Sequence, residues 1–188
     1  MIKPIETIYK GYKFRSRLEA RWAVFFDALN ILYEYEKEGF DLDGVWYLPD
    51  FYLPAHDYWI DVKGKELPPN SDDYKKLSSL ATKIGKDVYY TVGSVWTPYE
   101  SESDFGKKVF NYYRPIHPGG NIASHHWWYE CPKCGNLCLV CFGKPGDKRC
   151  DCILTGDDDL LQFSDTPRLV EAYKKARQAR FEYGESPS

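Results

Sequence analysis

Residues 47–65, YLPDFYLPAHDYWIDVKGK, decide the fold that this sequence predicts. Two segments rich in aromatic and β-branched residues flank the turn-forming stretch PAHD, which is the pattern of a β-hairpin. Such a hairpin makes Asp50 and Asp61 cross-strand neighbours. Because side chains alternate along a strand, Asp61 and Lys63 share one face while Val62 points into the core. Two carboxylates and one ammonium group therefore share a small patch.

This patch has the composition of a divalent-cation site. Mg²⁺ prefers oxygen ligands, and it is typically held by one or two protein carboxylates, several waters and substrate phosphate. A lysine beside the cation orients or deprotonates a water, or holds the phosphate as a point charge. In an unrelated α/β domain, Asp61 and Lys63 are simply the polar face of a strand. That alternative does not account for Pro49-Asp50 at a strand end or for Gly64 directly after the lysine, so the catalytic interpretation is favoured.

Hydrophobic periodicity predicts regular elements on both sides of the patch. Residues 5–14 alternate around Gly11 and indicate a short hairpin or arm. The elements that follow are a helix over 16–30, strands over 32–39, 45–50 and 58–63, a helix over 72–84 and a strand over 87–93. The strand at 45–50 ends at Asp50, and Gly85 stops the second helix. A strand that follows such a helix suits a crossover in a partly parallel sheet.

Charged residues on the two predicted helices are candidates for the site and its surroundings. Ser16 and Glu19 fit a capping box, which is the simpler interpretation of Glu19, although this side chain also lies where the apolar stripe faces the sheet edge. Arg17 and Arg21 lie one turn apart on the opposite flank, where they either grip phosphates or form a solvated basic face. The outer face of the second helix carries two further candidates for nucleic-acid binding, Lys75 and Lys76.

The motifs in the first half of the chain resemble those of the PD-(D/E)XK nuclease superfamily. Pro49-Asp50 followed by Asp61-Val62-Lys63 is similar to its signature, and FRSRLEA at 14–20 is similar to the first helix of phage-encoded and transposase-like endonucleases. The resemblance implies an α/β restriction-endonuclease-like core with helix, three strands, helix and strand in a mixed sheet. It implies that Mg²⁺ or Mn²⁺ is held by Glu19, Asp50, Asp61 and the Val62 carbonyl, with Lys63 as the catalytic lysine.

The implied activity is hydrolysis of phosphodiester bonds. DNA is the expected substrate and partner, and RNA stays open. A non-catalytic nucleic-acid-binding or assembly protein built on the same fold is the alternative. A hydrolase of another phosphate ester is a third possibility, which a panel of substrates separates from the first two.

The cysteines predict a second metal site. All six lie within residues 131–152, which in a cytosolic chain argues for metal binding rather than disulfides. A CPKCG turn at 131–135 and a CDC pair at 150–152, with room between them for a hairpin of residues 137–142 with 143–147 as its turn, resemble a zinc ribbon. The expected structural Zn²⁺ ligands are Cys131, Cys134, Cys150 and Cys152. Cys138 and Cys141 form a competing pair inside an apolar run, where buried thiols are the simpler interpretation.

Composition limits the class of protein. With 188 residues and 43% hydrophobic content, the chain has enough apolar material for one domain with an appendage. A net charge of −3 argues against a globally basic nucleic-acid binder but permits local basic patches. We expect no membrane association, and a cytoplasmic location that for a phage-encoded protein means the host cytosol, because the sequence has no long apolar run and no signal-peptide pattern.

The predicted organisation has four parts. They are a nuclease core at 1–94, an aromatic-rich packed linker at 95–126, a zinc-ribbon-like module at 127–155, and an acidic loop with a basic C-terminal helix at 156–188. The last helix begins at Thr166-Pro167 and ends at Gly184. Its surplus of positive charges suits either a phosphate-facing surface or solubility. The oligomeric state is left open.

Overall fold

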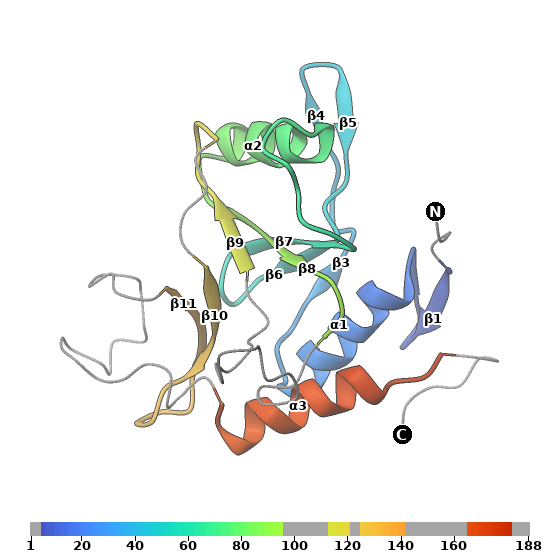
Figure 1. Ribbon diagram of the computed structural model, residues 1–188, viewed down its shortest axis with the longest axis vertical. Coiled ribbons are helices and arrows are strands. Elements are labelled where there is room, and N and C mark those ends of the chain that lie inside the picture. The colour runs from blue at the N-terminus through green and yellow to red at the C-terminus, as the bar shows by residue number, and fades with distance from the viewer. Residues whose placement is uncertain (1–4, 96–112, 121–124, 142–164, 182–188) are drawn as a thin grey trace, which may run out of the picture.

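The computed structural model describes residues 5–95, 113–120, 125–141 and 165–181. They form a mixed α/β fold with three helices and an open, seven-stranded sheet in the order β11-β10-β9-β8-β7-β6-β3 (Figure 1). The helices are α1 Arg17–Ala28, α2 Asp72–Ile84 and α3 Pro167–Gln178. The strands are β1 Thr7–Tyr9, β2 Tyr12–Phe14, β3 Glu34–Tyr35, β4 Phe40–Leu42, β5 Val45–Tyr47, β6 Phe51–Leu53, β7 Tyr58–Lys63, β8 Val88–Val92, β9 Tyr113–Ile116, β10 His126–Glu130 and β11 Leu137–Cys141. Among these helices, none has the length and apolarity that a membrane crossing requires.

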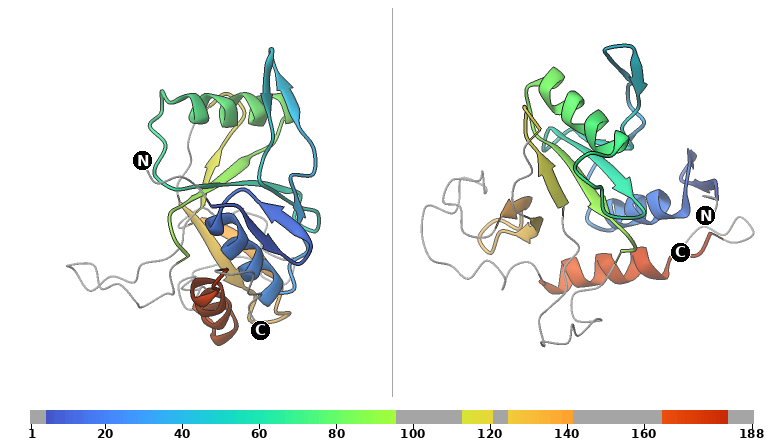
Figure 2. Two further views of the ribbon diagram at one scale, coloured as in Figure 1. Left: turned by 90° about the vertical axis from the view of Figure 1, so that its right-hand side faces the viewer. Right: turned by 45° about the horizontal axis from the view of Figure 1, so that its top comes forward.

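The sheet lies between two helical layers. Helix α2 covers one face, while α1 and α3 lie together on the other (Figures 1 and 2). Strand β7 divides its side chains accordingly: Ile60 and Val62 join the core cluster of α1 and α3, and Trp59 joins the cluster of α2. By the alternation of a strand, Asp61 and Lys63 share the face of Trp59, as the sequence predicts.

The predicted central hairpin is confirmed. Strands β6 and β7 are antiparallel, with Phe51 opposite Ile60, and the peptide N–H of His56 donates to the Leu53 carbonyl at 3.1 Å in the turn. Asp57 has a φ of 57°, a left-handed conformation that aspartate tolerates better than most residues. Asp50 immediately precedes β6, so the hairpin brings it to the level of Asp61.

The second helix and the strand after it also follow the prediction. Helix α2 spans the expected residues, with Ser71 accepting a hydrogen bond from the Tyr74 N–H at its start and Gly85 at φ 67° closing its end. Strand β8 then pairs with β7 in parallel. A parallel pair needs a crossover, and α2 supplies it.

Two of the predicted strands are wrong in their extent. The first core strand is Glu34–Tyr35 rather than 32–39, because Glu36 at φ 47° takes a left-handed conformation that ends the strand. The second prediction merged two strands. Residues Val45–Tyr47 pair with β4 in a separate hairpin, and the core strand β6 starts after Asp50 rather than ending there.

Local turn chemistry explains the separate β4–β5 hairpin. Its two-residue loop, Asp43 and Gly44, has φ values of 53° and 87°, the left-handed pair that suits a tight hairpin. The Gly44 N–H donates to the Asp41 carboxylate at 2.7 Å. The β4–β5 hairpin projects from the molecule beside α2 (Figure 1).

The region predicted as an irregular linker contains a strand of the main sheet. Strand β9 lies antiparallel to β8, with Pro115 opposite Tyr89. Proline has no N–H to donate, but it is tolerated here because β10 pairs with β9 only through His126 and Tyr113. Strands β10 and β11 continue the same sheet, so the hairpin that carries Cys131 and Cys134 in its turn is joined to the strands of the first half of the chain.

Helix α3 completes the core beneath α1. Thr166 caps it as predicted, but the helix ends at Gln178 rather than Gly184, since Ala179 turns to an extended conformation. The Tyr173 ring stacks on Phe25 of α1 at 4.4 Å between centroids. Arg168 donates to the Leu29 carbonyl at the end of α1 at 2.8 Å. The C-terminal helix is therefore a structural part of the core.

Truncating Tyr173 should destabilise the whole fold. Its side chain is 2% exposed, and removal of a large aromatic side chain from a core typically costs about 3–5 kcal/mol. We expect Tyr173→Ala to lower the free energy of unfolding in urea by this amount. The exposed neighbour Lys174 is the matched control, and Lys174→Ala should shift it by less than about 0.5 kcal/mol. Equal effects of the two substitutions would contradict the packing role of α3.

Candidate active site

Asp50 and Asp61 are joined directly at the end of the β6–β7 hairpin. The Asp50 N–H donates to Asp61 Oδ1 at 3.1 Å, and the Val62 N–H donates to Asp50 Oδ2 at 2.7 Å. Asp50 is 6% exposed and Asp61 is 1% exposed. Strand pairing therefore places two buried carboxylates side by side, as the sequence predicts for these two residues.

The second oxygen of Asp61 binds Lys63 and Tyr47. Lys63 Nζ lies 2.7 Å from Asp61 Oδ2, and the hydroxyl of Tyr47, at the end of β5, donates to the same oxygen. Burial and the neighbouring Asp61 raise the pKa of Tyr47 well above its usual value, so its hydroxyl stays protonated. Burial alone lowers the pKa of Lys63, but the attraction of Asp61 outweighs it and raises that pKa. Lys63 is thus held as an ammonium ion.

Glu19 reaches the same region from the first turn of α1. Ser16 Oγ donates to Glu19 Oε1 at 2.7 Å, and the Tyr35 hydroxyl donates to Glu19 Oε2 at 2.6 Å. The peptide N–H of Arg15 donates to Oε2 at 3.1 Å. Glu19 therefore takes part in the helix cap, as the simpler interpretation has it, and it is also buried, with its charge acting on Asp50.

The surroundings of Asp50 shift its pKa strongly. Burial raises its pKa well above the usual range, and the nearby negative charges of Asp61 and then Glu19 raise it further. The Val62 N–H and the Lys63 ammonium group act in the opposite direction without reversing the shift. The negative charges that act on the buried Asp50 thus favour a positive charge in its neighbourhood.

Arg15 supplies a positive charge that the sequence analysis missed. Its Nη2 lies 3.1 Å from Asp50 Oδ1, and its Nε lies 2.5 Å from Glu36 Oε1. Tyr35 and Tyr47 were missed as well. The Tyr35 hydroxyl donates a hydrogen bond to Glu19, and the Tyr47 hydroxyl donates one to Asp61. The available signal was position: Arg15 lies inside the FRSRLEA stretch, and Tyr47 lies just before Leu48-Pro49-Asp50.

The donor set fits a hard divalent cation, but it is not arranged as a coordination shell. Within the described residues, no group of three or more His, Cys, Asp or Glu side chains is placed to hold a metal ion. Each acid is instead engaged with the protein: Asp50 with Arg15, Asp61 with Lys63, and Glu19 with Tyr35. Buried carboxylate oxygens remain the ligands that Mg²⁺ and Mn²⁺ prefer. The ligand set of Glu19, Asp50, Asp61 and the Val62 carbonyl stays a prediction.

The four basic candidates for nucleic-acid binding differ in exposure. Arg17 and Arg21 are half-buried, and the Nε atom of each is buried. Lys76 is half-buried, whereas Lys75 is exposed and lies 3.8 Å from Asp72. Of these four side chains, Lys75 is the one most open to a phosphate group.

Half of the predicted zinc site lies within the described residues. The turn between β10 and β11 holds a buried Cys131 and an exposed Cys134. It is closed by hydrogen bonds from the Cys131 N–H to the Asn136 carbonyl and from the Gly135 N–H to the Cys131 carbonyl, both 2.8 Å long. Gly135 has a φ of 70°, which explains the glycine of CPKCG. Cys150 and Cys152, and the hairpin turn expected at 143–147, lie outside the described residues.

Of the two other cysteines, Cys138 fits the simpler interpretation. Cys138 is buried in a small apolar cluster with Trp127, Tyr129 and Val140. Cys141 closes β11 as its last residue. Cys138 therefore behaves as the predicted buried thiol, whereas the side chain of Cys141 lies outside what the structure describes.

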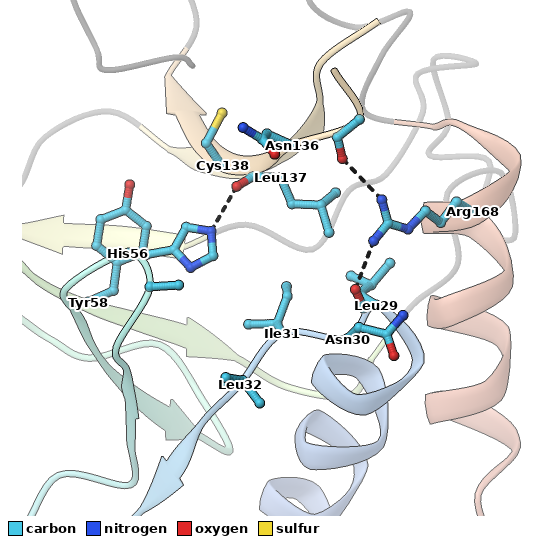
Figure 3. A pocket seen from close by; sticks show the side chains of 12 residues that line it. Leu29, Asn30, Ile31, Leu32, His56, Tyr58, Asn136, Leu137, Cys138 and Arg168 are labelled. Carbon is cyan, nitrogen blue, oxygen red and sulfur yellow. Dashed lines mark hydrogen bonds between the residues drawn. The ribbon is translucent and has the colours of Figure 1, made fainter. Parts of the chain in front are cut away.

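A pocket of about 640 Å³ lies at the opposite end of α1 from Glu19. Figure 3 shows it between the end of α1, the β6–β7 turn and the β10–β11 turn. His56 Nε2 contacts the Leu137 carbonyl at 2.7 Å, and Arg168 bridges the carbonyls of Leu29 and Gly135. None of the predicted active-site acids lines this pocket, so it is separate from the carboxylate cluster.

The raised pKa of Asp50 predicts a specific dependence of stability on pH. The folded protein retains a proton on Asp50 that the unfolded chain releases, so stability falls as the pH rises from about 4 through the folded-state pKa. Asp50→Asn cannot ionise and should remove this decline. We expect the variant to gain stability relative to the parent as the pH rises, measured by urea unfolding in EDTA from pH 4 to 8. A difference that is constant over this interval would contradict the raised pKa.

Comparison with known proteins adds no relative. No protein-family model, curated protein or solved structure matches this chain.

Proposed function

We propose that this protein is a divalent-cation-dependent nuclease that hydrolyses phosphodiester bonds in DNA. The observation that carries the proposal is the direct linkage of Asp50, Asp61 and Lys63 at the end of one hairpin, with the buried Glu19 near enough for its charge to act on Asp50. Burying acids that repel one another destabilises the folded state, and such groups cluster at functional sites. A bound cation would offset the repulsion.

The order of elements supports the same proposal. Helix α1, strands β3, β6 and β7, helix α2 and strand β8 follow one another with two antiparallel pairings and then a parallel one. The β4–β5 hairpin interrupts this order as an insertion. A restriction-endonuclease-like core, which the PD-(D/E)XK resemblance implies, has this order of helices and strands.

In the proposed reaction, Glu19, Asp50, Asp61 and the Val62 carbonyl would hold Mg²⁺ or Mn²⁺. When bound, such a cation would supply a lowered pKa of a water and a positive charge that offsets the phosphate. Lys63 is charged and paired with Asp61, so it is suited to orient the attacking water or hold a phosphate oxygen by donating hydrogen bonds. Tyr47 fixes the orientation of Asp61 through its hydroxyl.

A second candidate function is nucleic-acid binding without cleavage. It is favoured by the observation that each acid already has a partner within the protein and that the described residues contain no preformed metal group. Arg17, Arg21, Lys75 and Lys76 are the proposed phosphate contacts in both cases. Salt-dependent binding of DNA with no Mg²⁺- or Mn²⁺-dependent cutting would favour this second function.

Removal of the Lys63 ammonium group tests catalysis. We expect Lys63→Ala to lower the rate of DNA cleavage in Mg²⁺ by about 10²- to 10⁴-fold, because a positioned proton donor or acceptor contributes a factor of that size. Lys65→Ala removes the same charge from an exposed side chain in the same segment and should cleave at nearly the parent rate. Linear, nicked, branched and single-stranded DNA are all assayed, with RNA as a further substrate. Cleavage by Lys63→Ala at the parent rate would sink the assignment.

The zinc proposal is tested separately from cleavage. We propose that Cys131, Cys134, Cys150 and Cys152 bind one structural Zn²⁺. Native mass spectrometry should find one zinc per chain in the parent and none in Cys134→Ser, a substitution at an exposed position. Cys138→Ala should keep its zinc, because Cys138 lies in an apolar cluster. Zinc-free parent protein, or loss of zinc only in Cys138→Ala, would contradict this ligand set.

A further inference from the structure

The two oxygens of Asp50 differ in how easily they can be released. Oδ2 accepts a hydrogen bond from the Val62 N–H at 2.7 Å, and this contact belongs to the backbone of the central strand β7. Oδ1 is bound by Nη2 of Arg15 at 3.1 Å. Any other cation that binds Asp50 without disturbing β7 must therefore take Oδ1, the oxygen that Arg15 occupies.

The main chain of Arg15 is held by hydrogen bonds, whereas its side chain is exposed enough for another cation to displace it from Asp50. Its peptide N–H donates to Glu19 Oε2 at 3.1 Å and to the Tyr35 hydroxyl oxygen at 3.0 Å, which anchors the main chain beside α1. The side chain is 53% exposed, and its guanidinium also contacts Glu36 and the Leu48 carbonyl. The guanidinium can thus leave Asp50 and enter solvent while the main chain and Glu19 stay in place.

We propose that Arg15 is the built-in counter-ion of the carboxylate cluster and that a divalent cation binds Asp50 only by displacing it. Arg15 and the metal then compete for one oxygen, so each weakens the binding of the other. Glu36 contacts the Nε atom of the Arg15 guanidinium. This contact favours the state in which Arg15 is bound to Asp50. Arg15 is a positioning residue in this scheme, since it acts through Asp50.

The competition has a direct consequence for metal affinity. Removal of the Arg15 charge leaves Asp50 Oδ1 open among buried acids, so a cation should bind more tightly to the variant than to the parent. A purely structural role for Arg15 has the opposite effect, because loss of its contacts with Asp50, Glu36 and Leu48 would loosen the site. The sign of the change in metal affinity therefore separates the two roles.

The experiment measures Mn²⁺ binding to the full chain in the absence of DNA, by electron paramagnetic resonance of free Mn²⁺. We expect Arg15→Gln to lower the Kd for Mn²⁺ about tenfold, a typical size for coupling between two sites. Arg15→Lys keeps a positive charge and should return the Kd toward the parent value. Asp61→Asn added to Arg15→Gln should abolish the gain, which locates the ion in the carboxylate cluster.

Lys13→Gln is the matched control. It removes one positive charge from the same segment, but Lys13 pairs with Glu6 at 2.7 Å instead of with the acids, so its Kd should equal that of the parent. An unchanged or weaker affinity in a folded Arg15→Gln variant overturns the proposal, as does an equal gain in Lys13→Gln. The inference rests on the proposed function, yet the failures differ. Absence of Mn²⁺ binding in parent and variants sinks both, whereas equal binding in all of them removes only the role of Arg15.

Discussion

The pairing register of β6 with β7 is the constraint on which the candidate site depends. With Phe51 opposite Ile60, the Asp50 N–H meets Asp61 and the Val62 N–H meets Asp50, so each aspartate is held through the other's strand. A slip of one residue would turn Asp61 toward the α1 face and Ile60 toward α2, exchanging the polar and apolar sides of the strand. The buried neighbours of β7 on both faces make such a slip costly.

Burial of three acids is tolerated because the protein surrounds them with hydrogen-bond donors. Tyr35 serves Glu19, Tyr47 and Lys63 serve Asp61, and Arg15 serves Asp50. An unpaired charge in such a place costs far more than an exposed one. The donors come from β2–α1, β3, β5 and β7, so elements distant in sequence are tied together through the site. Its charges and the packing of the core are therefore not independent.

Patterns local in the sequence predicted the fold best. The β6–β7 hairpin, α2 with its end at Gly85, and the parallel strand β8 follow from turn residues, a glycine stop and hydrophobic period. Prediction failed where one residue overrides the pattern: a left-handed Glu36 shortens β3, and the Asp43-Gly44 turn takes β5 away from the main sheet. Strand β9 was missed because its proline is excluded from fully paired strands, and here the pairing is incomplete.

The predicted acids are brought to one place, but their partners were not predicted. Asp50 and Asp61 lie close together because a hairpin is a short-range feature of the sequence. Arg15 and Tyr35 meet Glu19 through packing of α1 against the sheet, and nothing local in the sequence encodes that contact. Hydrophobic period indicates which residues are buried, whereas it does not indicate which charges face each other.

Because α3 packs on α1, residues 1–94 do not contain the whole hydrophobic core. Leu169, Ala172, Tyr173 and Ala176 fill the same core cluster as Phe25 and Phe26, so residues 1–94 alone leave that side of α1 open to water. During synthesis on the ribosome, every residue of the carboxylate cluster emerges long before the helix that closes the core beneath it. A nascent chain interrupted before α3 would thus contain every residue of the carboxylate cluster but lack the helix that covers this side of α1.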